Sequence, residues 1–426
     1  MKWAAILAVL LLAAAPLAAE LPLHESIAYG PAPGDQYWPV VATNGAGHLV
    51  VWTDGQSGNT EIWARGIEPG GEPRVEAIRV GSGSTLGAAL IWAGTGYMLL
   101  FTDHRDCWAL LLDSHGFVIA GRRRILANAS SWSAVSGTND IVITYTTPGE
   151  QRALFLSSSG QTTADLHLSA SASVIGPVVV RSAPYTAVWK GPGGIEAIRF
   201  NRSGPLDEKP RLLFEDASVI DLHVQSAGAD FLVVGRSATD GLFTRRISAD
   251  LNAIGPRNAL PFDSESFSIL PAGAVFILIA KRQSAAGVTV HGLKLDDQGR
   301  PIAEREIETI AHRRNPARLA VGAASSSAGI LIVYSNGPPA GFLDVFHTVV
   351  ATATLQPRRS NLPYRLSTSV VAQTTPVLVA GPASVLALWL EGGPGGYELW
   401  ARRLTHSGKA LDAEPVHLAF DAVGIS

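Results

Sequence analysis

The sequence contains very little cysteine and little charge. Its only cysteine among 426 residues is Cys107, and a single thiol cannot close an internal disulfide. The fold must therefore be held together by burial of apolar surface. Charged residues make up 16% of the chain and hydrophobic residues 47%, which excludes a disordered polymer. The net charge of −3 provides no basic surface, so no nucleic-acid partner is expected.

The motifs by which many enzymes and metal proteins are recognised are also missing. No H-E-x-x-H, G-x-S-x-G or P-loop pattern is present, and neither is a D-x-D-x-D-G calcium loop. The repeated S-x-D-x-G-x-T-W boxes of sialidases are absent. The 11 histidines are scattered, with no pair at metal-ligand spacing. The sequence therefore predicts no catalytic residue, no metal site and no cofactor.

Long hydrophobic runs are absent except for one at the N-terminus. Lys2 supplies a positive charge, residues 4–15 form an apolar region, and small residues before Glu20 offer a cleavage site. This pattern predicts a signal peptide over residues 1–19. The run is too short to favour a lasting membrane span. We therefore expect a bacterial protein that is secreted or periplasmic, with no membrane span after cleavage.

A pattern of apolar stretches and turns recurs roughly every 45 residues along almost the whole chain. Each unit has an apolar stretch, a second one that tends to end in an aromatic residue, a polar turn, a third stretch, and a turn that often carries glycine. The clearest copies are the first, residues 39–73, and the last, residues 375–415. A fixed period of this length, with several strands in each unit, predicts a β-propeller.

The second stretch of each unit gives the number of repeats. It occurs in eight copies, at residues 47–52, 96–101, 140–145, 184–189, 230–235, 274–279, 329–334 and 384–389. Such apolar runs are buried on both faces, as in a strand between two neighbouring blades. We predict one all-β domain over residues 20–426, a single β-propeller of eight four-stranded blades. The alternative is seven blades, with residues 315–372 as an insertion; unrelated strands in several sandwiches fit the even spacing poorly.

Glycine marks the turn after the third stretch in six units: Gly71, Gly116, Gly160, Gly204, Gly299 and Gly408. Glycine supplies the positive φ that such a hairpin turn requires. In the fifth unit Asn252 is predicted to take this role, and the seventh unit, near Leu355, lacks the signal. Either chain end, residues 26–29 or the last strand, could supply the outer strand that closes the ring.

Two short motifs in the first unit read VWTD at residues 51–54 and EIWAR at residues 61–65. Together they resemble the repeats of bacterial exported β-propeller proteins, which typically read LVVWxDxR…DIYxxR…xxG. The second and last units carry parts of this pattern. Units three to seven depart from it, since Thr147, Gly191 and Ser237 stand where an acidic residue is expected. The resemblance implies the propeller fold and no particular function, because such repeats are scaffolds with diverse roles.

Candidate binding residues gather where a propeller brings its turns together. The turns between second and third strands share one face with the links between blades, and that face commonly holds the binding site around the central channel. We call it the channel face. In the first two units it is predicted to carry seven candidates: Asp35, Tyr37, Trp38, Asp54, Asp103, His104 and Arg105.

These candidates allow both a binding and a structural interpretation. The carboxylate, imidazole and guanidinium of residues 103–105 could bind an anion or move a proton. The structural interpretation is favoured, because Asp54 stands at the matching place and an aspartate can accept the backbone N–H bonds that hold a turn. Tyr37 and Trp38 could stack on a sugar or dock a partner, or Trp38 could fill the gap between blades.

The absence of catalytic motifs favours a non-enzymatic scaffold that binds a protein or carbohydrate ligand through the channel face. The alternative is a glycan-active hydrolase or lyase, with acidic and histidine residues at the channel mouth. That alternative requires two carboxylates within about 5–10 Å of each other. A third possibility, a structural module of a cell-surface assembly, requires a large exposed apolar patch.

Overall fold

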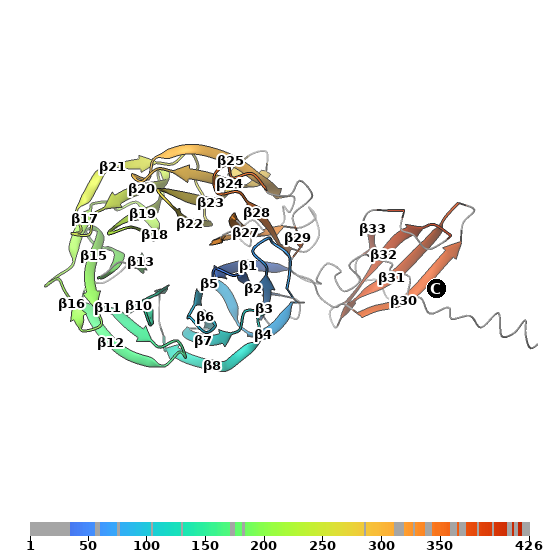
Figure 1. The fold of residues 1–426 in the computed structure, drawn as a ribbon, viewed down its shortest axis with the longest axis horizontal. Coiled ribbons are helices and arrows are strands. Elements are labelled where there is room, and N and C mark those ends of the chain that lie inside the picture. Colours follow the sequence, from blue (N-terminus) through green and yellow to red (C-terminus); the bar gives the residue numbers. More distant parts are fainter. Residues whose placement is uncertain are drawn as a thin grey trace, which may run out of the picture. The chain divides into compact units, whose positions relative to one another are not determined.

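The computed structural model describes residues 35–419, except for residues 56–59, 75–76, 104, 129–130, 171–174, 181–183, 285–286, 311–318, 327–328, 337–342, 358–363, 366–371, 381–382, 394–395, 407–410 and 413–415. In this part of the chain every regular element is a β-strand. The strands pair into eight antiparallel sheets, drawn in Figure 1. The all-β class and the eight sheets that the repeats predict are confirmed.

Seven of the sheets belong to one compact unit, Gly34–Thr368, and we call them blades 1 to 7. In each blade the strands lie side by side in chain order, and in blade 4 the outer place is shared by β16 and β17. Blade 1 consists of β1 (Gln36–Thr43), β2 (His48–Asp54), β3 (Glu61–Ile67) and β4 (Ile78–Ser82), and blade 2 of β5 (Ser84–Trp92), β6 (Tyr97–Asp103), β7 (Asp106–Leu112) and β8 (Val118–Leu126). Blade 3 consists of β9 (Ser131–Ser136), β10 (Ile141–Thr147), β11 (Glu150–Leu156) and β12 (Thr162–Ser169). Blade 4 consists of β13 (Ile175–Val180), β14 (Tyr185–Gly191), β15 (Gly194–Asn201), β16 (Gly204–Pro205) and β17 (Arg211–Phe214).

Blades 5 to 7 follow the same plan. Blade 5 consists of β18 (Val219–Ala227), β19 (Asp230–Ser237), β20 (Gly241–Ile247) and β21 (Ala253–Ala259). Blade 6 consists of β22 (Phe267–Ala272), β23 (Val275–Ser284), β24 (Gly287–Leu295) and β25 (Pro301–Ile310), and blade 7 of β26 (Val321–Ser326), β27 (Gly329–Asn336), β28 (Asp344–Val350) and β29 (Tyr364–Arg365). All the predicted second stretches within this unit form the second strand of a blade. Every residue of β2 is buried, because each face of a second strand lies against a neighbouring blade.

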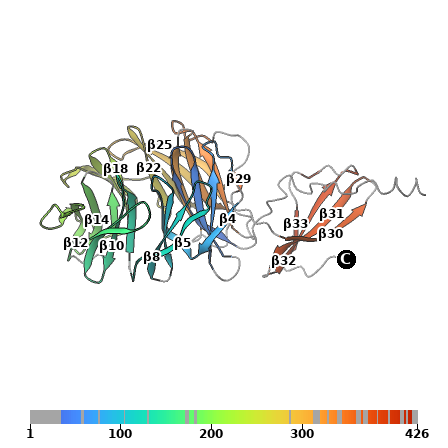
Figure 2. The same ribbon diagram turned by 60° about the horizontal axis from the view of Figure 1, so that its bottom comes forward.

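Blades 1 to 7 form a closed ring. Their inner strands contact one another in the order β1, β5, β9, β13, β18, β22 and β26, and β26 contacts β1 again. Figure 1 shows the ring from its end, and Figure 2 shows its sheets standing side by side. The ring therefore has seven blades, the lower of the two predicted numbers. That alternative treats residues 315–372 as an insertion, whereas the strands described within this range, β26 to β29, form the seventh blade.

The hydrophobic core is divided among the interfaces between blades. Seven clusters of buried apolar side chains lie in the ring, and each joins two neighbouring blades. Trp189 of blade 4, for example, packs in one cluster with Phe155 of blade 3. A single blade thus leaves apolar faces that only its neighbours cover, which is the property that makes repeat proteins cooperative.

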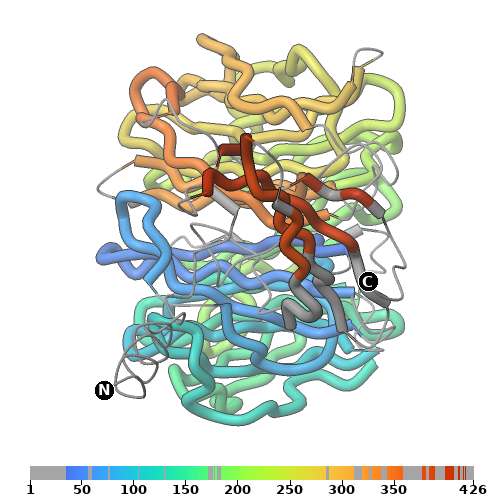
Figure 3. Tube along the Cα trace, turned by 90° about the vertical axis from the view of Figure 1, so that its right-hand side faces the viewer, coloured from blue at the N-terminus to red at the C-terminus, as the bar shows by residue number. Residues whose placement is uncertain are grey.

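The seam between blades 7 and 1 closes the ring without an exchanged strand, since each blade uses consecutive strands. Trp52 of blade 1 packs with Val333 of blade 7 in the seventh cluster. The backbone N–H of Gln36 donates to the carbonyl of Leu343 at 2.6 Å. Figure 3 shows the blue strands of blade 1 beside the orange strands of blade 7. The strand predicted at residues 26–29 lies outside the described residues.

The turn glycines meet two requirements. All of those within the described residues, Gly71, Gly116, Gly160, Gly204 and Gly299, have positive φ, as predicted. A Cβ on Gly71 would also lie 3.0 Å from Cγ2 of Val349 in blade 7. The carbonyl of Gly71 accepts a hydrogen bond from Nε2 of His347, also in blade 7. Glycine here permits both the turn and its close approach to the next blade.

Leucine takes the place of the turn glycine in two blades. In blade 5 the residue with positive φ is Leu251, at 62°, so the prediction for Asn252 is wrong. In blade 7 it is Leu355, at 57°. Their side chains are 3% and 2% exposed and lie in the clusters of blades 4–5 and 6–7. Burial of the leucine side chain offsets the cost of the left-handed backbone, which the sequence alone does not reveal.

The second compact unit includes Ser369–Ser426 and holds the eighth sheet. Its strands pair in chain order: β30 (Ala372–Ala380), β31 (Val385–Gly393), β32 (Gly396–Leu404) and β33 (Val416–Ala419). Ala387 and Leu404 form its small buried cluster, with Val385 and Trp400 packed against them. The last repeat therefore forms the predicted four-stranded sheet, with its own apolar cluster.

Candidate functional site

The channel face is one end of the ring. In four blades, a backbone N–H at the end of the second strand donates to a carbonyl just before the inner strand: Gly55 to Asp35, Ala238 to Ser218, Lys281 to Ser266, and Ser335 to Ala320. These repeated bonds place the turns between second and third strands beside the links that enter each blade. The expected juxtaposition of turns and links is thus present, on the face where propellers commonly bind ligands.

Asp35 and Asp54 in blade 1 are engaged within the ring. Asp54 is only 2% exposed, and its Oδ2 accepts a hydrogen bond from Nε2 of Gln36 at 2.8 Å. Oδ1 of Asp35 accepts from the backbone N–H of Leu343 in blade 7 at 3.1 Å. Asp54 is thus hydrogen-bonded within blade 1, and Asp35 is hydrogen-bonded across the seam between blades 7 and 1.

Asp103 lies at the end of β6 and forms an ion pair with Arg122 of β8. The Arg122 guanidinium lies 3.9 Å from the centroid of the Trp108 ring, so an aromatic surface supports the pair. Arg105 is exposed in the following turn, and His104 lies outside the described residues. In blade 2 the structure thus brings Asp103 together with Arg122, a residue that the sequence analysis did not single out.

Tyr37 is buried and Trp38 is partly exposed beside it, with ring centroids 4.5 Å apart and an edge-to-face angle of 84°. Trp38 has a φ of 54°, in the left-handed region. Gly87 and Gly176, with φ of 68° and 91°, hold the equivalent place in β5 and β13, two residues before regular pairing resumes after a β-bulge. This conformation costs a bulky residue about 1–2 kcal/mol, and such strain concentrates at functional sites.

Three cations lie near the channel-face ends of the second strands of adjacent blades: Lys190 in β14, Arg236 in β19 and Lys281 in β23. Nζ of Lys190 donates to the carbonyls of Ala217 and Val219, each at 2.7 Å. Lys281 is 3% exposed, and its Nζ lies 3.9 Å from Oε2 of Glu265. A positive charge directly after an apolar run is the sequence signal that marks these residues, and it is less conspicuous than the aspartates that end the second strands of blades 1 and 2.

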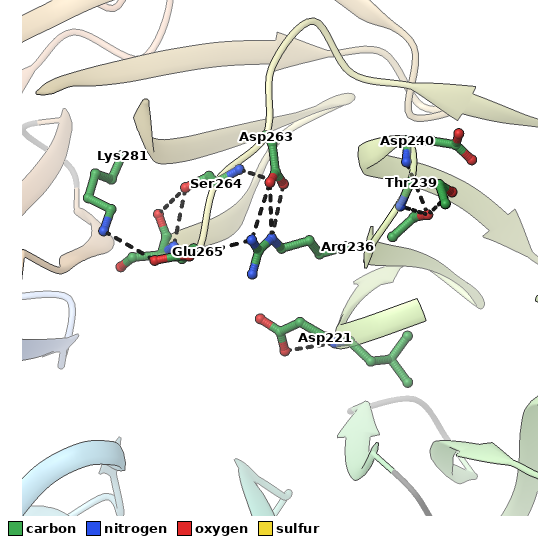
Figure 4. A network of polar contacts seen from close by, with 11 residues as sticks. Asp221, Arg236, Thr239, Asp240, Asp263, Ser264, Glu265 and Lys281 are labelled. Carbon is green, nitrogen blue, oxygen red and sulfur yellow. Dashed lines mark hydrogen bonds and ion pairs between the residues drawn. The ribbon is translucent and has the colours of Figure 1, made fainter. Parts of the chain in front are cut away.

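Arg236 is the centre of the network drawn in Figure 4. Its Nε lies 3.0 Å from Oδ1 of Asp263, and its Nη2 lies 3.2 Å from Oδ2, which makes a bidentate pair. Nη2 also lies 3.6 Å from Oε1 of Glu265, the carboxylate that Lys281 approaches. Asp221 at the start of β18 is paired with Arg236 in the strand register. We call Asp221, Arg236, Asp263, Glu265 and Lys281 the Arg236 cluster.

Two serines order the segments that carry this cluster. Ser264, in the link between blades 5 and 6, is 4% exposed, and its Oγ donates to the carbonyl of Ser266 at 2.7 Å. Ser237 stands where blades 1 and 2 carry aspartate, and its Oγ accepts from the backbone N–H groups of Thr239 and Asp240, each at 3.2 Å. The link and the turn are therefore held by the chain itself.

Burial and pairing shift several pKa values in the cluster. The hydrogen bond to Asp263 raises the pKa of Arg236, which stays charged. Burial lowers the pKa of Lys281, and the attraction of Glu265 only partly opposes that effect. Burial would raise the pKa of Asp221, but its hydrogen bond and charge interaction with His223 lower it below the ordinary value.

The exposed part of the cluster consists mainly of carboxylates. The side chains of Asp263 and Glu265 are 49% and 60% exposed, whereas those of Arg236 and Lys281 are 21% and 3% exposed. A ligand on this face would therefore meet hydrogen-bond acceptors that buried cations neutralise. Hydroxyl groups and other uncharged donors suit such a surface better than a strong anion or cation. No three His, Cys, Asp or Glu residues within the described chain lie together as a metal site.

Known proteins resemble this chain only distantly. No family model and no curated protein matches the chain. Similar solved structures include apo AztD from Citrobacter koseri, at 11% identity and a TM-score of 0.45 over 78% of this chain and 87% of that one. The Dos1 propeller has 8% identity and a TM-score of 0.44 over 85% and 93%. A puromycin hydrolase mutant complexed with PGG has 14% identity and a TM-score of 0.49 over 86% and 60%.

Similarities this low carry no argument about activity. The strand topology defines the class: residues Gly34–Thr368 form a seven-bladed β-propeller. None of the described residues belongs to a helix able to cross a membrane.

Proposed function

We propose that the ring is a non-enzymatic scaffold that binds a polar ligand, either a small molecule or a polar segment of a partner, on its channel face. The Arg236 cluster carries this proposal. Its carboxylates are partly exposed, yet ion pairs with Arg236 and Lys281 and an ordered link hold them in place. Groups that are fixed before a ligand arrives lose little conformational entropy on binding, which favours affinity.

A glycan-active hydrolase or lyase is the weaker alternative. Asp263 and Glu265 do converge, since both approach Nη2 of Arg236. Each of them is engaged by a cation of the chain itself, however, since Arg236 holds Asp263 in a bidentate pair and Lys281 lies beside Glu265. Most glycosidases use one carboxyl group as acid and a second as base or nucleophile, and both groups must reach the scissile bond. The cluster therefore favours binding over cleavage.

Arg236→Ala is expected to abolish binding on the channel face. The probes are neutral oligosaccharides, dipeptides and dicarboxylates, tested by their shift of the melting temperature and then by calorimetry. Arg246→Ala is the matched control in the same blade. Arg246 also pairs with two carboxylates, Asp230 at 2.9 Å and Asp297 at 2.8 Å, but it lies at the opposite end of the ring.

A probe that binds the wild type and Arg246→Ala, and binds Arg236→Ala at least ten-fold more weakly, would support the proposal. Both variants lose comparable ion pairs. A difference in their binding of the probe therefore shows that the probe binds on the channel face, and does not reflect a general loss of stability. Equal binding by wild type and Arg236→Ala, or no binding of any probe to the wild type, would refute it.

We also propose that the protein works outside the cytoplasm, in the periplasm or the medium of a bacterium. Lys2 followed by the apolar residues 4–15 supports this, because a positive charge before a short apolar region directs export. When the full chain is expressed in a bacterium, N-terminal sequencing of the exported protein should begin at Glu20. Recovery of the protein only in the cytoplasm, with Met1 retained, would contradict export.

A further inference from the structure

Trp38 differs from the other tryptophans of the ring in its packing. Each of the others lies in or against one of the seven apolar clusters: Trp52, Trp63, Trp92, Trp108, Trp132 and Trp189. Trp38 belongs to no cluster in the described chain and is partly exposed. It therefore does not fill the gap between blades as a core residue would. Its left-handed backbone, at a place where other blades carry glycine, is not explained by burial in a core.

The surrounding structure holds this conformation in place. The carbonyl of Trp38 accepts a hydrogen bond from Oγ1 of Thr85 in blade 2 at 2.8 Å. Thr85 is 1% exposed, and its backbone N–H donates to Oγ1 of Thr53 at 2.8 Å. The buried Tyr37 ring meets the indole edge to face, at 4.5 Å between centroids. Strain that the neighbours fix so firmly, at a partly exposed aromatic on the channel face, indicates a role in binding.

We propose that Trp38 is the stacking surface for a sugar ring of an uncharged carbohydrate bound on the channel face. This inference rests on the proposed function and names the ligand class. The apolar face of a sugar packs on an indole, while its hydroxyl groups need hydrogen-bond partners around them. The Arg236 cluster, on the same end of the ring, offers the exposed carboxylates of Asp263 and Glu265, with which Arg236 and Lys281 pair.

Charge balance decides between ligand classes. A cationic ligand would also stack on an indole, but it would require exposed carboxylates beside Trp38 that the ring does not already use for its own hydrogen bonds. In blade 1, Asp54 is buried against Gln36, and Oδ1 of Asp35 accepts from Leu343. An anionic ligand would meet the exposed carboxylates of Asp263 and Glu265. A neutral, hydroxyl-rich ligand avoids both penalties.

The experiment compares wild type with Trp38→Gly and Trp38→Phe. The probes are tetrasaccharides of β-1,4-linked glucose, β-1,4-linked mannose, α-1,4-linked glucose and β-1,4-linked N-acetylglucosamine, measured by titration calorimetry. Trp38→Gly should bind at least ten-fold more weakly than wild type, while its melting temperature equals or exceeds that of wild type, because glycine relieves the strained φ. Trp38→Phe keeps a smaller ring and should bind with an intermediate loss of a few fold.

Trp132→Phe is the control for a change at another inner-strand indole. Nε1 of Trp132 donates to Oγ1 of Thr102 at 3.1 Å, and the ring packs in the cluster of blades 2 and 3. This variant should melt at a lower temperature than wild type and bind the tetrasaccharide unchanged. Loss of binding together with a normal melting temperature is thus specific to Trp38.

Each outcome separates the ligand class from the proposed function. If no tetrasaccharide binds, or if Trp38→Gly binds as wild type does, the stacking proposal is overturned. The proposed function still stands in that case when another probe binds in an Arg236-dependent way. Tight binding of a charged probe, such as oligogalacturonate or an acidic peptide, through Trp38 and without any neutral tetrasaccharide would also overturn the inference.

Discussion

Replacing Trp52 with alanine is expected to lower the free energy of unfolding by about 3–5 kcal/mol, the usual cost of deleting a large buried aromatic side chain. Trp52 is 1% exposed and lies in the cluster that joins blades 1 and 7, with Leu331 and Val333. Loss of the indole would leave a cavity at the seam of the ring. Each blade uses consecutive strands, so no exchanged strand compensates there. Denaturant unfolding of the purified protein measures the effect.

Trp52→Phe is the matched control. The indole Nε1 of Trp52 is buried and has no hydrogen-bond partner within the described chain, so phenylalanine sacrifices no bond. It keeps much of the apolar volume and should cost only about 1–2 kcal/mol. Trp189→Ala, at the interface of blades 3 and 4, should cost as much as Trp52→Ala. A loss below about 1 kcal/mol for Trp52→Ala would show that packing at the seam does not hold the ring closed.

The blades could be predicted from the sequence because each is specified locally. The apolar second strands and the glycine turns recur in the order that the sheets require. The number of blades in the ring is not specified within any one repeat, because each blade contacts only its two neighbours. A ring closes when the small rotations between neighbours add up to a full turn. Similar repeats therefore fit a ring of eight as readily as a ring of seven and a separate sheet.

The candidate site is less visible in the sequence than the fold. Asp54 and Asp103 attract notice because they recur at matching places, yet they serve the blade and its outer strand. Arg236 and Lys281 come from different blades, and only the packing of blade 5 beside blade 6 brings both to Glu265. The left-handed backbone of Trp38 is not predictable from the residue type. It becomes recognisable when β1 is aligned with β5 and β13, which carry Gly87 and Gly176 at the equivalent place.

The protein is expected to lose stability between about pH 6.5 and pH 4 because of one buried histidine. His48 in β2 is 1% exposed, and neither ring nitrogen has a hydrogen-bond partner within the described chain. Burial lowers its pKa to about 4, and the charges of His347 and Arg74 act in the same direction. In the unfolded chain the imidazole regains its ordinary pKa of about 6.5.

The sign follows from which state binds the proton. Between pH 6.5 and pH 4 the unfolded chain protonates His48 and the folded ring does not, so acid favours unfolding. Above this range both states carry a neutral ring, and below it both carry a charged ring. The contribution of His48 to stability therefore changes with pH only within this range, and the stability lost there is not regained at lower pH. A shift of this size corresponds to roughly 3 kcal/mol, at about 1.4 kcal/mol per pH unit.

His48→Leu separates this effect from the titration of surface carboxylates. Leucine fills the buried place of the imidazole with an apolar side chain that binds no proton. The variant should therefore lose less stability than wild type as the pH falls from 7 to 4. His115→Leu is the control, because the His115 side chain is 47% exposed, in a turn of blade 2 outside the buried seam. It should follow the pH dependence of wild type. Parallel unfolding free energies for wild type and His48→Leu across this range would contradict the prediction, and would mean that the seam of the ring accommodates a charged imidazole near His347 and Arg74.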